Sequence, residues 1–515
     1  MIKIEIKFLY FLFTVLLFYI VFRTGLHGDD LIFIDSLQNK SFIEFLSMPF
    51  VNKEVHILTL PSYYYLFWAY WLFGLEHQIL YDFLKALFLL FSFYFIFKFC
   101  SAYLNKYQSI IFALLFIFYP SHDTTVYWYV TNSYIFVPAL IMYSHYLINR
   151  NNFKIGIILA FLSSFAFYTS PPFVFGLSLI FFLNKQFKKF IFFIIPGVCY
   201  LFYYFLFFFF SDNIEKRISS EISILEIIKN ITIQFLSSID SVIGPSFWLK
   251  IFWSFNYLSL FSFILSLILV IFFILTNKLS VNKISTSLLI SFFSIFLLSI
   301  LMLAVTGLYT QTAFNLGNRV TIYASLFVSF IIVSYIKSKK VIISIVVLFV
   351  FTSFGISDYW KLWNNKQNAI LYNIENNHSF LKINSNDILI ISNNIYSKFG
   401  PFDHIEFFSM PWIVETIFKD KVKTKKIIAI TSHTTIKDNQ IIDRKYHNII
   451  ELNNSIYLYD SEKQFLKKIQ SQDLINLVEQ TNIEKRHWTQ LYKIPLVNNL
   501  ILYLNPSFKH FFKTE

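Results

Sequence analysis

The chain has 515 residues and a net charge of +13; 56% of its residues are hydrophobic, 21% are aromatic and only 14% are charged. This composition excludes an ordinary soluble globular protein and predicts a polytopic α-helical membrane protein. The positive charge does not indicate a nucleic acid partner, because the Lys and Arg residues cluster in short loops between apolar segments, as the positive-inside rule requires. Cys100 and Cys199 lie within or beside apolar runs and have neither a disulfide nor a metal-binding spacing.

About eleven apolar runs are long enough, or nearly long enough, to cross a bilayer. The first has a basic start like that of a secretory signal, but no small-residue cleavage site follows it, so we expect it to be retained. The expected spans lie near residues 7–22, 79–99, 107–120, 131–148, 155–169, 171–184, 187–210, 249–276, 284–305, 319–336 and 340–357. The short loops on one side each carry at least two Lys or Arg, which predicts a cytoplasmic N-terminus in the inner or plasma membrane. An odd number of spans then places the chain beyond the last span on the non-cytoplasmic side.

The segment RTGLHGDDLIFID at 23–35 emerges where the first span ends, and it contains the adjacent carboxylates Asp29 and Asp30. Ionised side chains beside hydrocarbon are costly and often mark function in membrane proteins. A purely structural alternative is that Asp29 caps a helix beginning at Leu31 while Asp30 and Asp35 face solvent.

Three other outer segments carry structural expectations. The stretch LPSYYYLFWAYWLFG at 60–74 is short and rich in Tyr and Trp, so we expect it to lie flat on the outer surface within the loop 23–78. Pro171 and Pro172 indicate either a broken helix that lines a cavity or a tight outer turn. Within the loop 211–248, apolar residues recur at helical spacing and predict an amphipathic helix that either gates a cavity or packs against the membrane.

The composition changes at about residue 358, beyond which Asn, Lys and Asp become frequent. Short β-like runs, DILIIS, KKIIAITS, IIELNNSIYLYD and NNLILYL, alternate with helical patterns such as SEKQFLKKIQSQDLINLVEQ at 461–480. We therefore expect residues 1–357 to form a membrane domain and residues 358–515 to form a soluble, non-cytoplasmic α/β or α+β domain. The tail has no glycine-rich phosphate loop and no Cys or His cluster with metal spacing, so its sequence assigns it no chemistry.

The order of features in the first third of the chain resembles that of membrane-embedded glycosyltransferases of the GT-C fold, particularly bacterial protein mannosyltransferases and lipid A aminoarabinose transferases. In that superfamily a first span is followed by an acidic pair, by a proline-led aromatic segment that ends in Phe-Gly, and by the second span. GDDLIF supplies the acidic pair here, and HILTLPSYYYLFWAYWLFG supplies the aromatic segment, with Asp-Asp where many relatives have Asp-Glu and one proline where they usually have two. Two further stretches are similar to later motifs of the superfamily: YPSHDTTVYWYVTNS, after the third span, and NLGNRVTIYASLF at 315–327.

The resemblance implies an integral membrane glycosyltransferase that moves a sugar from a polyprenyl-phosphate donor to a glycan, lipid or protein acceptor outside the cytoplasm, with inversion at the anomeric carbon. Because the phosphate leaving group is already a stable anion, the protein must supply a base for the acceptor hydroxyl and a cation for the phosphate. The resemblance implies Asp29 or Asp30 as the catalytic base. Arg319 is the candidate phosphate partner, since a guanidinium binds phosphate oxygens in a bidentate manner. Arg319 could instead extend its side chain to the membrane interface.

Other polar and aromatic residues of the outer loops are candidates for substrate binding. His27, His122 and Asp123 could position donor or acceptor, and Trp128 could stack on a sugar ring. The alternatives are ordinary loop residues and an aromatic belt at the membrane interface. The acidic pair, together with His27 and Asp123, also supplies ligands suited to a divalent cation such as Mg, Mn or Zn, which some GT-C relatives use.

Two other classes of protein stay open. A transporter or polymerase of lipid-linked sugars would carry polar residues in mid-span and an internal repeat. The polar residues here lie at span ends and the sequence has no repeat, which favours the transferase. A receptor or scaffold whose tail binds a partner is the third class. The sequence does not identify the sugar, the acceptor or the length of the lipid.

Overall fold

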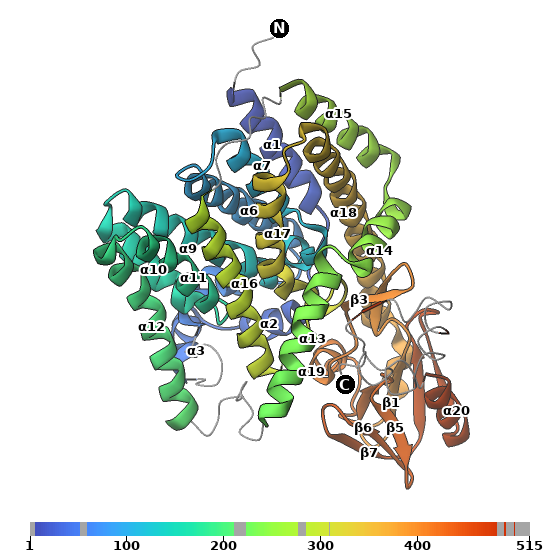
Figure 1. Cartoon of the computed structure of the whole chain (residues 1–515). Helices are drawn as coiled ribbons and strands as arrows, with labels where there is room; N and C mark the ends of the chain where they lie inside the picture. The colour runs from blue at the N-terminus through green and yellow to red at the C-terminus, as the bar shows by residue number, and fades with distance from the viewer. Residues whose placement is uncertain are drawn as a thin grey trace. The chain divides into compact units, whose positions relative to one another are not determined.

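The computed structural model describes residues 6–51, 59–210, 223–276, 285–307, 309–481, 489–490 and 499. The chain is mostly helical (Figure 1) and divides into two compact units. Unit 1 comprises Met1–Gly25 and Asn39–Trp360, and unit 2 comprises Leu26–Gln38 and Lys361–Glu515. The short segment that carries the acidic pair therefore packs with the C-terminal part of the chain, although its position in the sequence predicts that it belongs to the membrane domain.

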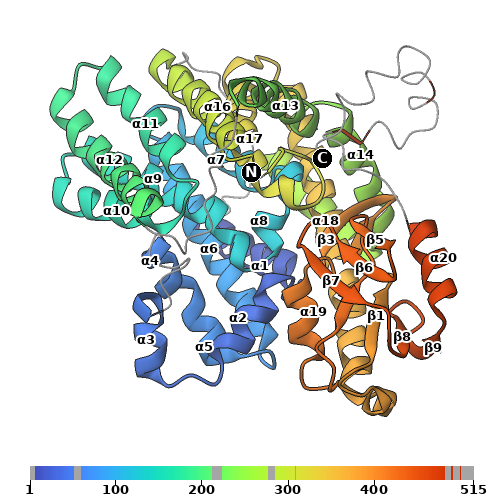
Figure 2. The same ribbon diagram turned by 90° about the horizontal axis from the view of Figure 1, so that it is seen from below.

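Unit 1 is built from helices. The longer ones are α1 (Ile6–Val21), α6 (Gln78–Cys100), α7 (Lys106–Ile117), α9 (Ser133–Asn149), α10 (Phe153–Ala166), α11 (Pro171–Leu183), α12 (Phe187–Phe210), α13 (Ile224–Val242), α14 (Pro245–Ser254), α15 (Leu260–Thr276), α16 (Thr286–Thr306), α17 (Ile322–Tyr335) and α18 (Lys339–Asn376), which runs on into unit 2. Short helices between them are α3 (Phe42–Val51), α4 (Leu60–Ser62), η2 (Tyr63–Phe67), α5 (Trp68–Phe73), η3 (Pro120–His122), α8 (Thr124–Tyr127), η4 (Val130–Asn132), η5 (Phe255–Tyr257) and η6 (Leu316–Thr321). Helices α9 to α12 pack together as one group on one side of unit 1 (Figures 1 and 2).

Several helices of unit 1 could cross a membrane. Among the described residues, five segments are long and apolar enough, or six if a bent pair of helices counts as one span. The five are Gln78–Cys100, Phe187–Leu206, Thr286–Thr306, Leu316–Tyr335 and Lys339–Asn376. The expectation of a helical membrane protein is supported in this coarse form. Each of the eleven expected spans contains a helix, but α7, α10 and α11 have only 12, 14 and 13 residues.

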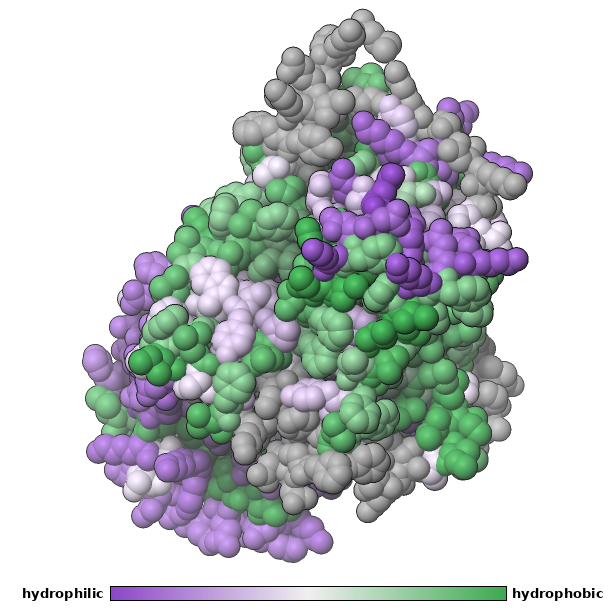
Figure 3. Space-filling view, turned by 90° about the vertical axis from the view of Figure 1, so that its left-hand side faces the viewer, coloured by the Kyte–Doolittle hydropathy of each residue, from purple (hydrophilic) through white to green (hydrophobic). Residues whose placement is uncertain are grey.

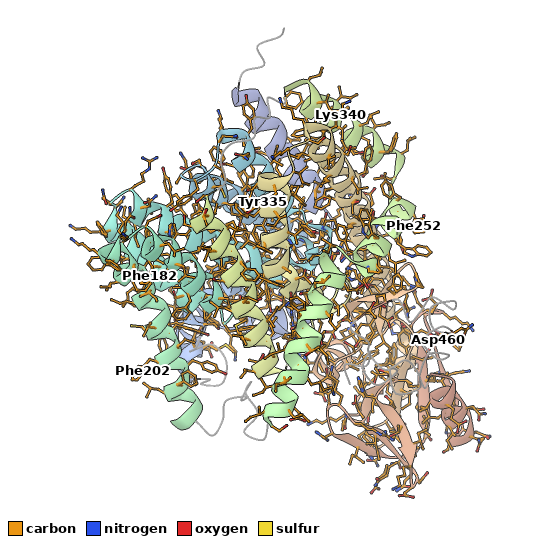
Figure 4. All side chains as sticks on the ribbon, in the orientation of Figure 1. Phe182, Phe202, Phe252, Tyr335, Lys340 and Asp460 are labelled. Carbon is orange, nitrogen blue, oxygen red and sulfur yellow. The ribbon has the colours of Figure 1, made fainter. Side chains whose placement is uncertain are left out.

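Large apolar side chains cover much of the outer surface of unit 1. Phe202 on α12 and Phe252 on α14 are 65% and 63% exposed and point away from their helices (Figure 4). The face on the side of α10 and α12 carries broad hydrophobic areas (Figure 3). Soluble monomers rarely expose apolar patches of this extent, so the surface fits contact with lipid.

Two glycines allow neighbouring helices of unit 1 to pack closely. Gly156 on α10 lies against α9, where Ser144 Oγ donates a hydrogen bond to Gly156 O at 2.7 Å. Gly176 on α11 lies against α16, where Ser291 Oγ donates to Gly176 O at 2.8 Å. Small residues and interhelical hydrogen bonds are what helix association in lipid requires, because apolar side chains gain little by leaving an apolar solvent.

The structure breaks the span expected at 249–276 into α14 and α15. The helical segments on either side of the break are bent by 117°. Asp358 on α18 stabilises the bend, because its carboxylate accepts hydrogen bonds from Ser259 N and Ser262 Oγ, both at 2.9 Å, at the N-terminus of α15. A carboxylate at this position satisfies otherwise unpaired N–H groups and complements the helix dipole. Asp358 lies 99 residues after Ser259 in the chain, so hydropathy alone could not predict the bend.

The last expected span, 340–357, is only the first half of α18. The helix continues because Trp360, Trp363, Gln367 and Ile370 recur at helical spacing and bury one face. The change of composition at residue 358 therefore marks a change in the exposed face of a helix and not its end. This correction matters for the site, because the second half of α18 contacts the segment before the acidic pair.

The aromatic segment at 60–74 is a helix with a π-helical turn, formed by α4, η2 and α5. Pro61 lies in its first turn, and Gly74 ends it with a positive φ of 58° that favours glycine. Pro171 and Pro172 begin α11, where a proline removes no helical hydrogen bond. The structure therefore favours the tight-turn interpretation of these prolines over a broken helix.

The amphipathic helix expected within the loop 211–248 is α13. It begins with a capping box between Ser223 and Glu226 and packs against α16. Gln234 Nε2 donates a hydrogen bond to Tyr309 O at 2.6 Å, which fixes α13 to the chain after α16. Residues 211–222 of the loop lie outside the described residues.

Unit 2 combines parallel and antiparallel strands. The described strands are β1 (Ile388–Ser392), β2 (Tyr396–Phe399), β3 (Phe402–Glu406), β4 (Ile427–Ala429), β5 (Thr434–Lys437), β6 (Gln440–Asp443), β7 (Asn448–Glu451), β8 (Ile456–Asp460) and β9 (Phe465–Ile469). One sheet has the order β4-β1-β8-β9, with β1 parallel to β4 and β8, and β9 antiparallel to β8. β2–β3 and β5–β6–β7 form two antiparallel sheets. The helices are α2 (Asp29–Leu37), η7 (His378–Lys382), α19 (Pro411–Phe418) and α20 (Ser471–Thr481).

The core of unit 2 is aliphatic. It includes Ile388 and Ile390 of β1, Ile428 of β4 and Leu458 of β8, all almost fully buried. Strands buried on both faces are expected to be continuous hydrophobic runs, which is why DILIIS and KKIIAITS predict strands correctly.

The helical pattern expected at 461–480 is wrong in its first half. Residues Phe465–Ile469 form β9, because a turn ending at Gln464, with a positive φ of 54°, folds the chain back onto β8. β9 lies at the edge of its sheet and carries Lys467 and Lys468, charges that protect an edge strand from pairing with other chains. The β-like run NNLILYL lies outside the described residues.

Candidate functional site

The acidic pair lies in a tight turn at the start of α2 in unit 2. The helix begins at Asp29, and Gly28 before it has φ 48° and ψ −118°, a conformation that favours glycine. Asp30 is fully buried, and its Oδ2 accepts a hydrogen bond from His27 N at 2.9 Å. Asp29 is half-buried. The alternative in which Asp29 caps a helix beginning at Leu31 and Asp30 faces solvent is therefore wrong, because Asp30 closes the turn with its own side chain.

One amide on α18 holds the residues before the acidic pair. Gln367 Nε2 donates a hydrogen bond to Leu26 O at 2.7 Å, and Gln367 Oε1 lies 3.2 Å from His27 Nδ1. All three residues are buried. His27 thus contacts a helix 340 positions further along the chain, within the same compact unit.

The helix that follows the acidic pair packs against α19. The buried apolar residues of α2 are Leu31, Ile34 and Leu37. Asp35 forms an ion pair with Lys419, just after α19, but both side chains are substantially exposed. An exposed pair contributes roughly 0–1 kcal/mol, so apolar burial holds α2 more than this ion pair does.

Asp123, expected to contact substrate or metal, lies in a buried network of unit 1. Its Oδ1 accepts hydrogen bonds from Lys250 Nζ at 2.5 Å and Asn318 Nδ2 at 2.6 Å, and its Oδ2 accepts one from Trp360 Nε1 at 2.8 Å. The side chains of Asp123 and Lys250 are 2% and 0% exposed. Both carboxylate oxygens are engaged by donors from three helices, which favours a structural role for Asp123.

The neighbours of Asp123 in the same loop are also buried. His122 Nδ1 lies 3.0 Å from Thr125 Oγ1, and burial lowers the pKa of His122 to about 3, so the imidazole is neutral at physiological pH. Trp128 is 1% exposed and lies inside the protein. Its ring therefore presents no open face on which a sugar could stack in this conformation.

Arg319 lies half-buried at the start of a candidate span, in a cage of tyrosines. Its guanidinium carbon is 4.5 Å from the ring centroid of Tyr309 and 5.7 Å from that of Tyr134. Tyr134 in turn shares a hydrogen bond with Tyr168. Aromatic faces hold a planar cation without neutralising it, so this arrangement keeps the charge of Arg319 and limits its freedom to extend to the membrane interface.

A second buried ion pair in unit 1 was not predicted from the sequence. Lys85 and Asp82, both on α6, are 2.7 Å apart and almost fully buried. Lys85 Nζ also donates to Thr24 Oγ1 at 2.6 Å, and to Gly25 O and Tyr127 O at 3.0 Å. Lys85 thus connects α6 to Thr24 and Gly25, which follow α1, and to Tyr127, which follows Asp123 in the chain.

A signal for some of these residues is present in the sequence. Lys85 in FLKALFLL and Lys250 in SFWLKIFW are isolated charges inside apolar runs, and such charges are costly unless they are paired. Gln367 has no comparable signal, because it is one of several amides in the polar segment NNKQN.

The predicted site residues are divided between the two units. His27, Asp29 and Asp30 share one turn in unit 2. The loop with Asp123 belongs to unit 1, and Asn318 connects it to the neighbouring Arg319.

Among the described residues, no three or more His, Cys, Asp or Glu side chains meet in a group that could hold a metal ion. At Asp123 the ammonium group of Lys250 already provides a positive charge.

No protein-family model, curated protein or solved structure matches this chain.

Proposed function

We propose that this protein is an integral membrane glycosyltransferase of GT-C-like architecture, which transfers a sugar from a polyprenyl-phosphate carrier to a glycan, lipid or protein acceptor. The observation that carries the proposal is the acidic turn, in which two adjacent aspartates follow the first helix and adopt different environments. The order of elements supports it as well: α1, the acidic turn, the aromatic helix ending in Phe-Gly and then α6 follow one another as the resemblance implies.

The proposal includes an eleven-span topology in the cell membrane with a cytoplasmic N-terminus. The spans would be α1, α6, α7, α9, α10, α11, α12, α15, α16, α17 and the first half of α18. The basic loops between them support this orientation by the positive-inside rule. The C-terminal part of the chain then lies outside the cytoplasm, where the acceptor is modified.

Asp29 is the better candidate for the catalytic base. Asp30 is fully buried and accepts a hydrogen bond from the backbone of its own turn, whereas Asp29 is partly accessible. In the proposed step, Asp29 takes the proton of an acceptor hydroxyl while the hydroxyl oxygen attacks the anomeric carbon. The bond from that carbon to the phosphate oxygen breaks on the opposite side, and polyprenyl phosphate leaves with the electron pair. Asp30 would keep the turn rigid so that Asp29 stays oriented.

Arg319 would bind the phosphate of the donor. A guanidinium positioned by tyrosine rings retains its N–H donors in one plane, as bidentate contact with phosphate oxygens requires. The leaving group needs no acid, since it departs as a stable anion and a fixed cation compensates its growing charge.

Mass spectrometry of surface glycans in cells with and without the gene tests the proposal. We expect a sugar to be missing without the protein and to return with the wild-type chain. Asp29→Asn should reduce its return by at least about 100-fold, because a general base typically contributes 10²–10⁴-fold. Asp438→Asn is the matched control, because Asp438 is exposed in a turn of unit 2.

The amount of each variant in the membrane must be equal for this comparison. A glycan profile that does not change when the gene is removed would refute the proposal. Full restoration of the missing sugar by Asp29→Asn would refute the assignment of the base.

A further inference from the structure

We infer that Gln367 is a positioning residue for the acidic turn, and that residues 361–515 of unit 2 thereby help to orient the proposed catalytic residues. This inference rests on the proposed function for its catalytic meaning. Its structural part rests only on the contacts between α18, His27 and the turn, all within unit 2.

The orientation of the Gln367 amide follows from its partners. Leu26 O is a carbonyl oxygen and can only accept, so the amide nitrogen must face it. The amide oxygen then faces His27 Nδ1 at 3.2 Å, and this contact is a hydrogen bond only if Nδ1 carries the hydrogen. In a neutral ring Nε2 is then the acceptor atom, so Gln367 selects one tautomer of His27 as well as its orientation.

The hydrogen bonds of Gln367 lead on to the acidic pair. His27 receives the Gln367 contact through its side chain and donates its backbone N–H to Asp30 Oδ2 at 2.9 Å. Leu26, His27 and Asp30 are all buried, so these hydrogen bonds have no competition from water. The path from α18 to the first turn of α2 therefore consists of the buried side chains of Gln367, His27 and Asp30 and the peptide segment Leu26–His27.

The rest of the turn also depends on the same unit. α2 packs on α19, and Lys419 pairs with Asp35. The acidic pair is thus organised by residues far beyond the last expected span, although it follows α1 in the sequence. Removal of residues 361–515 should abolish transfer altogether, whereas removal of a part that only selects acceptors would leave the chemistry intact.

Hydrogen exchange of the full-length protein in detergent tests the positioning without any assay of activity. In Gln367→Leu, which loses both contacts, we expect the amides of α2 to exchange at least about tenfold faster than in wild type. Gln472→Leu is the matched control, because Gln472 is exposed on α20, where its Nε2 donates a hydrogen bond to Asn476 Oδ1 at 3.4 Å. Lys419→Ala should change the exchange of α2 less than Gln367→Leu, since its ion pair is exposed.

A spectroscopic signature tests the tautomer. ¹⁵N-histidine-labelled protein at pH 8.5, where an ordinary imidazole is neutral, should show the hydrogen of His27 on Nδ1, with the signal assigned by its loss in His27→Ala. Gln367→Leu should move the hydrogen toward Nε2. Gln367→Glu keeps the acceptor but loses the donor to Leu26 O, so it should retain the hydrogen on Nδ1 and still speed the exchange of α2.

Two results would overturn the inference: unchanged α2 exchange in a folded Gln367→Leu or Gln367→Glu protein, or a wild-type His27 with its hydrogen on Nε2. The failure of the proposed function is a separate outcome. If α2 exchange and the tautomer respond as expected while removal of the gene leaves the glycans unchanged, the positioning holds and glycosyl transfer is refuted.

Discussion

Replacement of Asp123 by Asn separates a structural role for this residue from a role in substrate binding. Asn has nearly the same shape as Asp, so the variant creates no cavity and removes only the negative charge and part of the acceptor capacity. Lys250 then keeps its ammonium group inside unit 1 with 0% side-chain exposure and no opposing charge. The hydrogen bonds from Asn318 and Trp360 also weaken, because both residues donate to the same carboxylate.

The magnitude follows from the burial of this network. Removal of one partner of a buried ion pair typically costs about 3–5 kcal/mol, because the other charge stays buried without compensation. We therefore expect Asp123→Asn to lower the unfolding temperature by about 5 °C or more. Asp123→Leu combined with Lys250→Met removes both charges and should recover most of the stability, since an apolar pair of similar volume is often as stable as the ion pair.

Thermal unfolding of the full-length protein in detergent, followed by tryptophan fluorescence, measures these differences, with Asp438→Asn as the exposed control. An unfolding temperature of Asp123→Asn equal to that of wild type would refute the structural role. If the same variant lost glycan transfer without losing stability, Asp123 would return to the list of substrate contacts.

Three further predictions concern other parts of the chain. The pKa of His122 is about 3 in the folded protein and 6.5 in an ordinary chain, so between these pH values the unfolded state binds one more proton than the folded state. The free energy of unfolding should therefore fall by about 2–3 kcal/mol from pH 7 to pH 4.5. Denaturant unfolding should show that His122→Gln loses this part of the pH dependence. Gly176→Ala should destabilise by about 1–3 kcal/mol in the same measurement, because the added Cβ would overlap Ile295 Cγ1 and lie 3.0 Å from Ile295 N. Arg319→Lys should reduce glycan transfer at least about tenfold, because an ammonium cannot bind phosphate in a bidentate manner, whereas Tyr309→Phe keeps the aromatic face and should have little effect.

Predictions from the sequence succeeded where local hydropathy decides the structure. A helix lies at each expected span, and α13 forms where apolar residues recur at helical spacing. Strands β1, β4 and β8 lie within the expected β-like runs. In each case the signal is carried by neighbours in the chain and by how apolar they are.

The errors share a different cause. The bend between α14 and α15 needs Asp358, and β9 exists because it pairs with β8. α18 is longer than its apolar half because one face of the continuation is buried. Each error concerns a contact with residues outside the segment itself, which the pattern of neighbouring residues within that segment cannot predict.

The sequence by itself determined that the protein is rich in membrane-length helices and that two carboxylates follow the first of them. These properties depend on the cost of exposing apolar side chains to water and of placing charges beside hydrocarbon, both of which are local to each segment. Only the tertiary structure decided the partners of the buried polar groups, such as Lys250 for Asp123 and Gln367 for His27, which lie 127 and 340 positions apart. A buried polar group is stable only with a partner at hydrogen-bonding distance, and which partner arrives there depends on how the whole chain folds.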